Sequence, residues 1–123
     1  MAKLNVRIKG LKQFQKALGQ YPDIAGKYFA EAIKIAVFQL ERGIKRRTPV
    51  DTGMLRATIY HSMSTTEGRV YPTREYAPYV HYGTRHQKAQ PFLEWGISDA
   101  DREIDITFTK ALENTLNEIA KRS

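Results

Sequence analysis

The residues of this chain that come closest to a catalytic motif are Asp51, Thr52 and Gly53. Asp-Thr-Gly is also the active-site triplet of aspartic proteases, in which two carboxylates meet in a buried, coupled pair. That site requires an apolar strand leading into the aspartate, whereas here the triplet follows the basic, proline-broken segment 45–49. We therefore interpret the triplet as architecture, in which Asp51 caps a helical turn and Gly53 permits a tight backbone.

The histidines do not form a recognisable metal site. His81 and His86 lie five residues apart in a segment without an acidic or cysteine partner nearby, which is a poor pattern for zinc. No serine sits in the glycine-flanked elbow of a nucleophile, and no glycine-rich loop could cradle a phosphate. The chain has no cysteine, which excludes disulfides and thiolate ligands. These absences predict a protein that is not an enzyme and needs no cofactor or metal.

Length and charge narrow the class of protein further. We expect a single domain over residues 1–123, with no membrane span and no signal-peptide core. The net charge of +7 is uneven, because residues 1–90 carry sixteen lysines and arginines against six acids, whereas residues 91–123 carry four against seven. This polarity suits contact with a polyanion such as nucleic acid, head-to-tail contact between copies, or simply an unevenly charged surface.

The clearest predicted element is a helix over residues 22–47, which ends in a cationic last turn. Its apolar residues recur at helical spacing, and others widen the apolar surface, so we expect neighbours on two sides. Before it, residues 3–9 alternate as a half-buried strand, and residues 11–18 form a short helix that Gly19 and Pro22 interrupt. The expected buried stripe is Phe29, Ile33, Val37, Leu40 and Ile44.

A hairpin is predicted in the middle of the chain, after a single helical turn at residues 52–57. Its strands are expected at residues 58–63 and 69–71, where β-prone residues gather, with the turn at residues 66–68. An antiparallel pair of this kind needs a hydrophobic layer to cover it, and the predicted helices supply one.

The last third of the chain is expected to end in one long helix. Residues 76–82 fit either a short helix or a strand, and residues 83–88 read as an exposed polar loop. From Pro91 onward apolar residues recur at helical spacing as far as residue 119. The predicted fold is therefore α+β, a small antiparallel sheet packed against a long central helix and a C-terminal helix.

Tyrosines and arginines interleave within 17 residues around the hairpin and the following segment. Such a set could stack on the bases of single-stranded nucleic acid, form a protein interface, or belong to the edge of the sheet core. A small nucleic-acid-binding protein is therefore the alternative function. The residues concerned are Arg69, Tyr71, Arg74, Tyr76, Tyr79, Tyr82 and Arg85.

Three constrained segments, taken in order and spacing, resemble the tail-completion (head–tail joining, neck) proteins of long-tailed siphophages and their prophages. They are Arg-Arg-Thr-Pro-Val-Asp-Thr-Gly-Met-Leu-Arg-Ala-Thr-Ile at residues 46–59, Tyr-Ala-Pro-Tyr-Val-His-Tyr-Gly-Thr at 76–84, and Ala-Gln-Pro-Phe-Leu at 89–93. The resemblance covers residues 25–105. The chain departs from the family at His81, where an acidic residue is usual, and at residues 94–96, where Glu-Trp-Gly replaces Arg-Pro-Ala.

The resemblance implies a structural protein of the phage virion, assembled in the host cytoplasm and located at the head–tail junction. Its partners would be further copies in an oligomeric ring, the connector or head-completion protein, and the tail terminator. DNA passing through the ring, without sequence readout, is a further candidate partner. The polarised charge fits a ring, because a basic run at residues 42–56 could face an acidic run at residues 94–105 of the next copy.

These implications suggest three groups of site residues. The predicted subunit-contact elbow comprises Arg46, Arg47, Asp51, Thr52, Gly53 and Arg56. The predicted interface loop, which would face DNA or an adjacent ring, comprises Tyr79, Tyr82, Gly83, Thr84, Arg85, His86 and Lys88. The predicted anchor of the C-terminal helix comprises Pro91, Phe92, Leu93 and Trp95.

Overall fold

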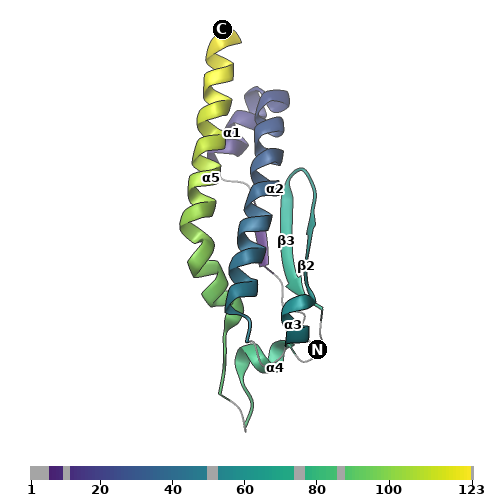
Figure 1. The fold of residues 1–123 in the computed structure, drawn as a ribbon. Helices are drawn as coiled ribbons and strands as arrows, with labels where there is room; N and C mark the ends of the chain where they lie inside the picture. The colour runs from purple at the N-terminus through teal and green to yellow at the C-terminus, as the bar shows by residue number, and fades with distance from the viewer. Residues whose placement is uncertain (1–5, 10–11, 50–52, 74–76, 86–87, 123) are drawn as a thin grey trace.

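The computed structural model describes residues 6–9, 12–49, 53–73, 77–85 and 88–122, which form an elongated α+β body (Figure 1). Helices dominate, and a small antiparallel sheet packs against them, so the predicted fold class is confirmed. In chain order the elements are β1 (Val6–Lys9), α1 (Lys12–Gln20), α2 (Pro22–Arg47), α3 (Gly53–Ala57), β2 (Ile59–Met63), β3 (Glu67–Pro72), α4 (Ala77–Tyr82) and α5 (Phe92–Arg122).

Helix α2 has the predicted bounds, and its ends explain why. A proline and Asp23 occupy the first turn, and cations occupy the last, as the helix dipole favours. Thr48 then adopts an extended conformation with ψ of 131° ahead of Pro49, where helix is sterically disfavoured. All five residues of the predicted stripe are buried.

Helix α2 packs against neighbours on two sides, as its wide apolar surface predicted. Figure 1 shows α5 along one side of α2 and the β2–β3 hairpin along the other. Glycines permit both close approaches. A Cβ at Gly68 would lie 2.2 Å from Cγ2 of Val37, and one at Gly96 would lie 2.5 Å from Cα of Ile44. The helix is therefore held between two layers at van der Waals contact.

The sheet has three strands in the order β1-β3-β2, and both pairings are antiparallel. Val70 of β3 stands at the centre, opposite Val6 of β1 and His61 of β2. The predicted turn at residues 66–68 is wrong, because β3 already begins at Glu67 and the connection is residues 64–66. Gly68 suggested a turn, but it lies in the strand, where its missing side chain makes room for α2.

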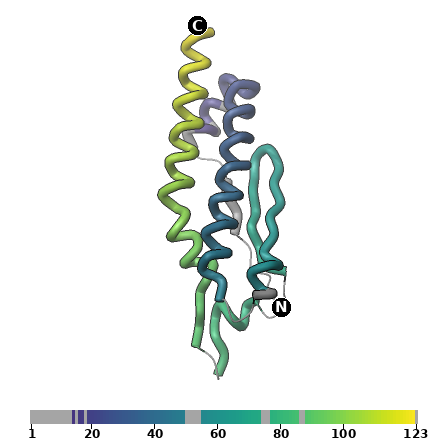
Figure 2. The backbone as a smooth tube through the Cα atoms, viewed as in Figure 1, coloured from purple at the N-terminus to yellow at the C-terminus, as the bar shows by residue number. Residues whose placement is uncertain are grey.

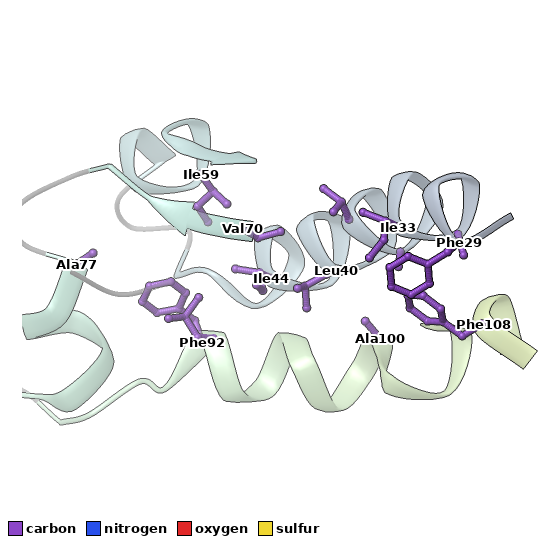
Figure 3. Close-up of a cluster of buried hydrophobic side chains, with 14 of the residues drawn as sticks. Phe29, Ile33, Leu40, Ile44, Ile59, Val70, Ala77, Phe92, Ala100 and Phe108 are labelled. Atoms are coloured by element: carbon purple, nitrogen blue, oxygen red, sulfur yellow. The ribbon is translucent and has the colours of Figure 1, made fainter. Parts of the chain in front are cut away.

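One hydrophobic core runs the length of the molecule between α2, α5 and the sheet (Figure 3). At one end the rings of Phe14, Phe29 and Phe108 pack together with centroids 5.1–6.3 Å apart, which joins α1, α2 and α5. At the other end Phe92 of α5 is fully buried near the start of α4. Burial of these aromatic rings is the main hydrophobic contribution at both ends.

The remaining elements resolve the ambiguous sequence segments. Helix α1 continues through Gly19 to Gln20, so the predicted interruption at Gly19 is wrong, since a glycine lowers helix propensity without forbidding it. Residues 77–82 are helical, and Gly83 ends α4 with a positive φ of 82°. The tube in Figure 2 shows α5 running unbroken to residue 122.

Candidate subunit interface

One end of the molecule gathers the described members of the predicted site. Figure 1 shows the C-terminal end of α2, helices α3 and α4, and the start of α5 meeting there. Asp51, Thr52 and His86 lie outside the described residues, so the proposed cap of Asp51 is not part of this account. Gly53 is the first residue of α3.

The elbow after α2 is held by hydrogen bonds inside the subunit. Thr48 is buried, and both its N–H and its Oγ1 donate to the carbonyl of Ile44, at 3.0 and 2.7 Å. Nη2 of Arg56 donates to the carbonyl of Thr48 at 3.1 Å, which ties α3 back to the end of α2. Nε of Arg56 is buried without a hydrogen-bond partner among the described residues. Arg56 thus has an internal structural contact as well as a predicted external one.

Two contacts between members of the predicted basic and acidic runs lie within one subunit. Arg47 makes a two-pronged contact with Asp99, Nε to Oδ2 at 2.5 Å and Nη2 to Oδ1 at 3.0 Å. Arg42 donates to Glu103 at 2.6 Å. The expectation that the whole runs 42–56 and 94–105 face each other across subunits is therefore wrong for these four residues, whose helices are neighbours in the same chain.

The Arg47 contact also shifts proton affinities. Its hydrogen bonds to the carboxylate lower the pKa of Asp99, and the same contact raises the pKa of Arg47. Both side chains are 40–49% exposed, so solvent screens the attraction and the pair aligns α5 with α2 more than it stabilises the fold.

A groove of about 380 Å³, here called the basic groove, lies on the free face of α2 beside α3. Its one carboxylate, Glu41, is already occupied, since it binds Lys45 at 3.3 Å and Nδ1 of His61 at 3.0 Å. Four cations and one acid line the groove, so it is electropositive even though Arg42 pairs with Glu103 outside the lining. Arg46 is exposed and makes no direct ion pair with a residue in the described ranges, although it contributes to the lowered pKa of Asp99. The lining residues are Phe38, Glu41, Arg42, Lys45, Arg46 and Arg56.

The predicted interface loop projects from the same end, and its exposed side chains are here called the tip. Tyr79 is 50% and Tyr82 is 67% exposed, so neither belongs to the core. Thr84, Arg85 and Lys88 are exposed on the segment that follows. The tip thus comprises Tyr79, Tyr82, Thr84, Arg85 and Lys88, and it combines aromatic and cationic side chains.

The predicted anchor of α5 divides into a buried and an exposed part. Phe92 and Leu93 are buried and Pro91 is half-buried, whereas Trp95 is 39% exposed. The N–H of Gln90 donates to the carbonyl of Val80 at 2.9 Å, which ties the connecting segment to α4. Phe92 and Leu93 are therefore placed to fix the start of α5, and Trp95 is placed for external contact.

His81 contributes to the packing between α4 and the start of α5, a role that the sequence did not predict. It is buried, with its ring edge-on to Tyr82 and Phe92 at centroid distances of 4.6 and 5.6 Å. Its Nδ1 has no hydrogen-bond partner in the described part of the chain. The feature of the sequence that could have indicated burial of His81 is its position next to the apolar Val80 in a short helical segment. The His61–Glu41 pair, between residues 20 apart, gave no local signal.

His81 should make stability depend on pH. Burial lowers its pKa from the ordinary 6.5, and the opposing attraction of Glu94 is smaller. Between the lowered and the ordinary value the unfolded chain binds more protons, so the free energy of unfolding should rise with pH through this window. Urea unfolding from roughly pH 5 to 8 measures the slope. His81→Leu should flatten it, and an unchanged slope in this variant would contradict the assignment.

The described residues also bear on the other kinds of site that the sequence raised. No group of three or more histidines, acids or cysteines among the described residues could hold a metal ion. No described helix is long and apolar enough to cross a membrane. The aromatic and basic set proposed for nucleic acid is divided, with Arg69 and Tyr71 on β3 and the two tip tyrosines on α4. Arg74 and Tyr76 of that set fall outside the description.

Comparison with known protein families gives a match to a family of phage proteins. The model of the family described as "Bacteriophage HK97-gp10, putative tail-component" matches residues 12–83, which is more than half of the chain. The matched region contains α2, the elbow, the hairpin and α4. Neither a search of curated proteins nor one of solved structures gives a match.

Proposed function

Because the chain belongs to the HK97-gp10-like family of bacteriophage tail components, we propose that it is a structural protein of the virion that joins tails to heads. The whole of residues 1–123 would act as one neck-type domain, without enzymatic activity. Copies would assemble into a ring between the connector or head-completion protein and the tail terminator. Assembly would take place in the host cytoplasm, and DNA would pass through the ring without sequence readout.

The tip is the observation that carries this proposal. Tyr79 and Tyr82 are at least half exposed, and Arg85 and Lys88 are also exposed. Helix α4, which carries the two tyrosines, lies at one end of the elongated subunit (Figure 1). Tyrosine and arginine are enriched among the residues that dominate protein interfaces, where they bury large areas at low entropic cost. An elongated subunit that exposes such residues at one end could form a ring whose edge binds a neighbouring ring.

The test is a phage that lacks this gene, complemented with variants. Without the protein, lysates should contain full heads and complete tails that are not joined, because the subunit would act after both are built. The tip variant Tyr82→Ser with Arg85→Ser should reduce the yield of joined particles at least about tenfold, as loss of a hot spot does. Electron microscopy of lysates counts heads, tails and joined particles.

The matched control is Tyr60→Ser, since this tyrosine is 53% exposed on β2 and is not a member of the tip. The control should join particles as the wild-type chain does. Normal yields without the gene would contradict the head–tail assignment. Loss of heads or of tails would place the protein earlier in assembly. If instead the isolated protein binds DNA tightly at low salt and particles form normally, the nucleic-acid alternative gains.

A further inference from the structure

We propose that the basic groove binds the acidic stripe on α5 of a second copy of this chain, in a head-to-tail contact. The acidic stripe is Glu94, Ile97, Asp101 and Asp105. The inference deepens the proposed function, on which it rests, because it names the contact by which copies would form the ring. It replaces the broad pairing of whole charged runs with two defined surfaces of the folded subunit.

The basic groove is electropositive, and it also exposes an aromatic side chain. Lys45 and Arg46 lie in the last turns of α2. Lys45 contacts Glu41, whereas Arg46 is exposed and makes no direct ion pair with a described residue. Phe38 is 47% exposed, and its ring stands edge-on to His61 at 5.0 Å, which holds it in place. Ile35, one turn earlier, is 50% exposed. A ligand that fits must therefore offer both negative charge and apolar surface.

The acidic stripe offers both. Its residues follow the spacing i, i+3, i+7, i+11, so they lie along one side of the helix over about 16 Å. Glu94, Asp101 and Asp105 are exposed, and none makes an ion pair with a residue in the described ranges. Ile97 is 37% exposed among them. The stripe is thus the charge complement of the groove and includes an apolar residue to meet Phe38.

The two surfaces lie on opposite flanks of the subunit, so they do not satisfy each other internally. Asp99 and Glu103 occupy the flank of α5 that pairs with Arg47 and Arg42 of α2. At about 100° per residue, the acidic stripe lies about 160° around the helix from that flank. One copy can therefore use its groove on one neighbour and its stripe on another. Different patches used head to tail generate a ring when the rotation closes.

The exposed apolar residues favour a protein occupant over DNA. A phosphate backbone would match the cations, but it has no counterpart for the half-exposed Phe38 and Ile35. A helix carrying acids and an isoleucine matches the whole surface. DNA binding at the groove is accordingly an outcome of the test that would overturn the proposal.

Charge reversal tests the contact. The groove variant is Lys45→Glu with Arg46→Glu, and the stripe variant is Asp101→Lys with Asp105→Lys. Each alone should weaken self-association at least about tenfold, because like charges then face each other. Their 1:1 mixture should recover association, because the unchanged stripe of one variant meets the unchanged groove of the other and the reversed groove meets the reversed stripe. All four changes in one chain should restore association, and this rescue cannot come from a variant that fails to fold.

A cysteine cross-link detects the contact even when association is weak, because the chain contains no cysteine. Copies with Arg46→Cys mixed with copies with Asp105→Cys should give a disulfide-linked dimer. Copies with Lys110→Cys serve as the control, since Lys110 is exposed on the same flank of α5 as Glu103 and should not cross-link to Arg46→Cys.

Three results would overturn the inference: equal cross-linking at Asp105 and Lys110, no cross-linking at all, or charge variants that associate as the wild-type chain does. Salt-dependent DNA binding that the groove variant abolishes, without effect on self-association, would also overturn it. These results are separable from failure of the proposed function. A phage that joins heads to tails without the protein would refute the function, whereas normal joining by the groove variant would refute only this contact.

Discussion

Replacement of Gly96 with alanine is expected to destabilise the protein by about 3 kcal/mol or more, the upper range for overpacking a close contact. The new Cβ would lie 2.5 Å from Cα and 2.7 Å from the backbone nitrogen of Ile44. Backbone atoms of a helix cannot move aside as a flexible side chain can, so α5 would have to separate from α2. Urea unfolding of the variant and the wild-type chain measures the loss.

The sign of this effect is informative, because helix propensity alone predicts the opposite. In an exposed helix, alanine is favoured over glycine by about 1 kcal/mol. Gly19 of α1 is the matched control, since a Cβ there would meet nothing within 4 Å. Gly19→Ala should therefore stabilise the protein slightly. If Gly96→Ala is also neutral or stabilising, the close crossing of α2 and α5 is refuted.

Phe92→Ala is expected to cost about 3–5 kcal/mol, the range for truncating a buried phenylalanine. Phe92 is fully buried at the start of α5 and stands edge-on to His81. Its loss would leave a cavity between α4 and α5 and release the tip from its support. Against a total stability of about 5–15 kcal/mol, this is a large fraction. Urea unfolding again gives the value.

Trp95→Ala, three residues later, is the matched aromatic truncation, and it should cost much less because Trp95 is 39% exposed. Phe92→Ala should also weaken the dependence of stability on pH, since His81 would gain access to water and its pKa would return toward its ordinary value. Equal losses for the two truncations would contradict the described burial of Phe92.

The helices were predictable from local pattern. The bounds of α2 followed from its breaker residues, its acidic first turn and its cationic last turn, and its buried stripe followed from helical spacing. The start of α5 followed from Pro91, whereas Phe92 was named as an anchor only through the family resemblance. These features are local, and tertiary contacts reinforced them instead of overriding them.

The positions of glycines could not be read correctly from the sequence alone. Gly68 looked like a turn residue but lies inside β3, because its value is the space it leaves for Val37. Gly19 looked like a helix end but continues α1. Both errors have the same cause. A glycine has several physical uses, and which one applies depends on what approaches it in the folded chain.

The sequence revealed the basic and acidic runs, but not whether they pair within one subunit or between subunits. That depends on how α5 is aligned along α2. From the sequence alone, we expected contact between copies. The alignment instead places Arg47 beside Asp99 and Arg42 beside Glu103 within one subunit. Only the folded structure separates charges that form direct ion pairs within the subunit from those, such as Arg46, that do so with no described residue.

The central claim, that this protein joins tails to heads, is tested most directly by adding the purified chain to a lysate of phage lacking its gene. Electron microscopy then counts joined particles against free heads and tails. We expect the purified protein to convert separate full heads and complete tails into joined, infectious particles, and the tip variant to fail. Full joining in the lysate before the protein is added, or none after it, would contradict the account.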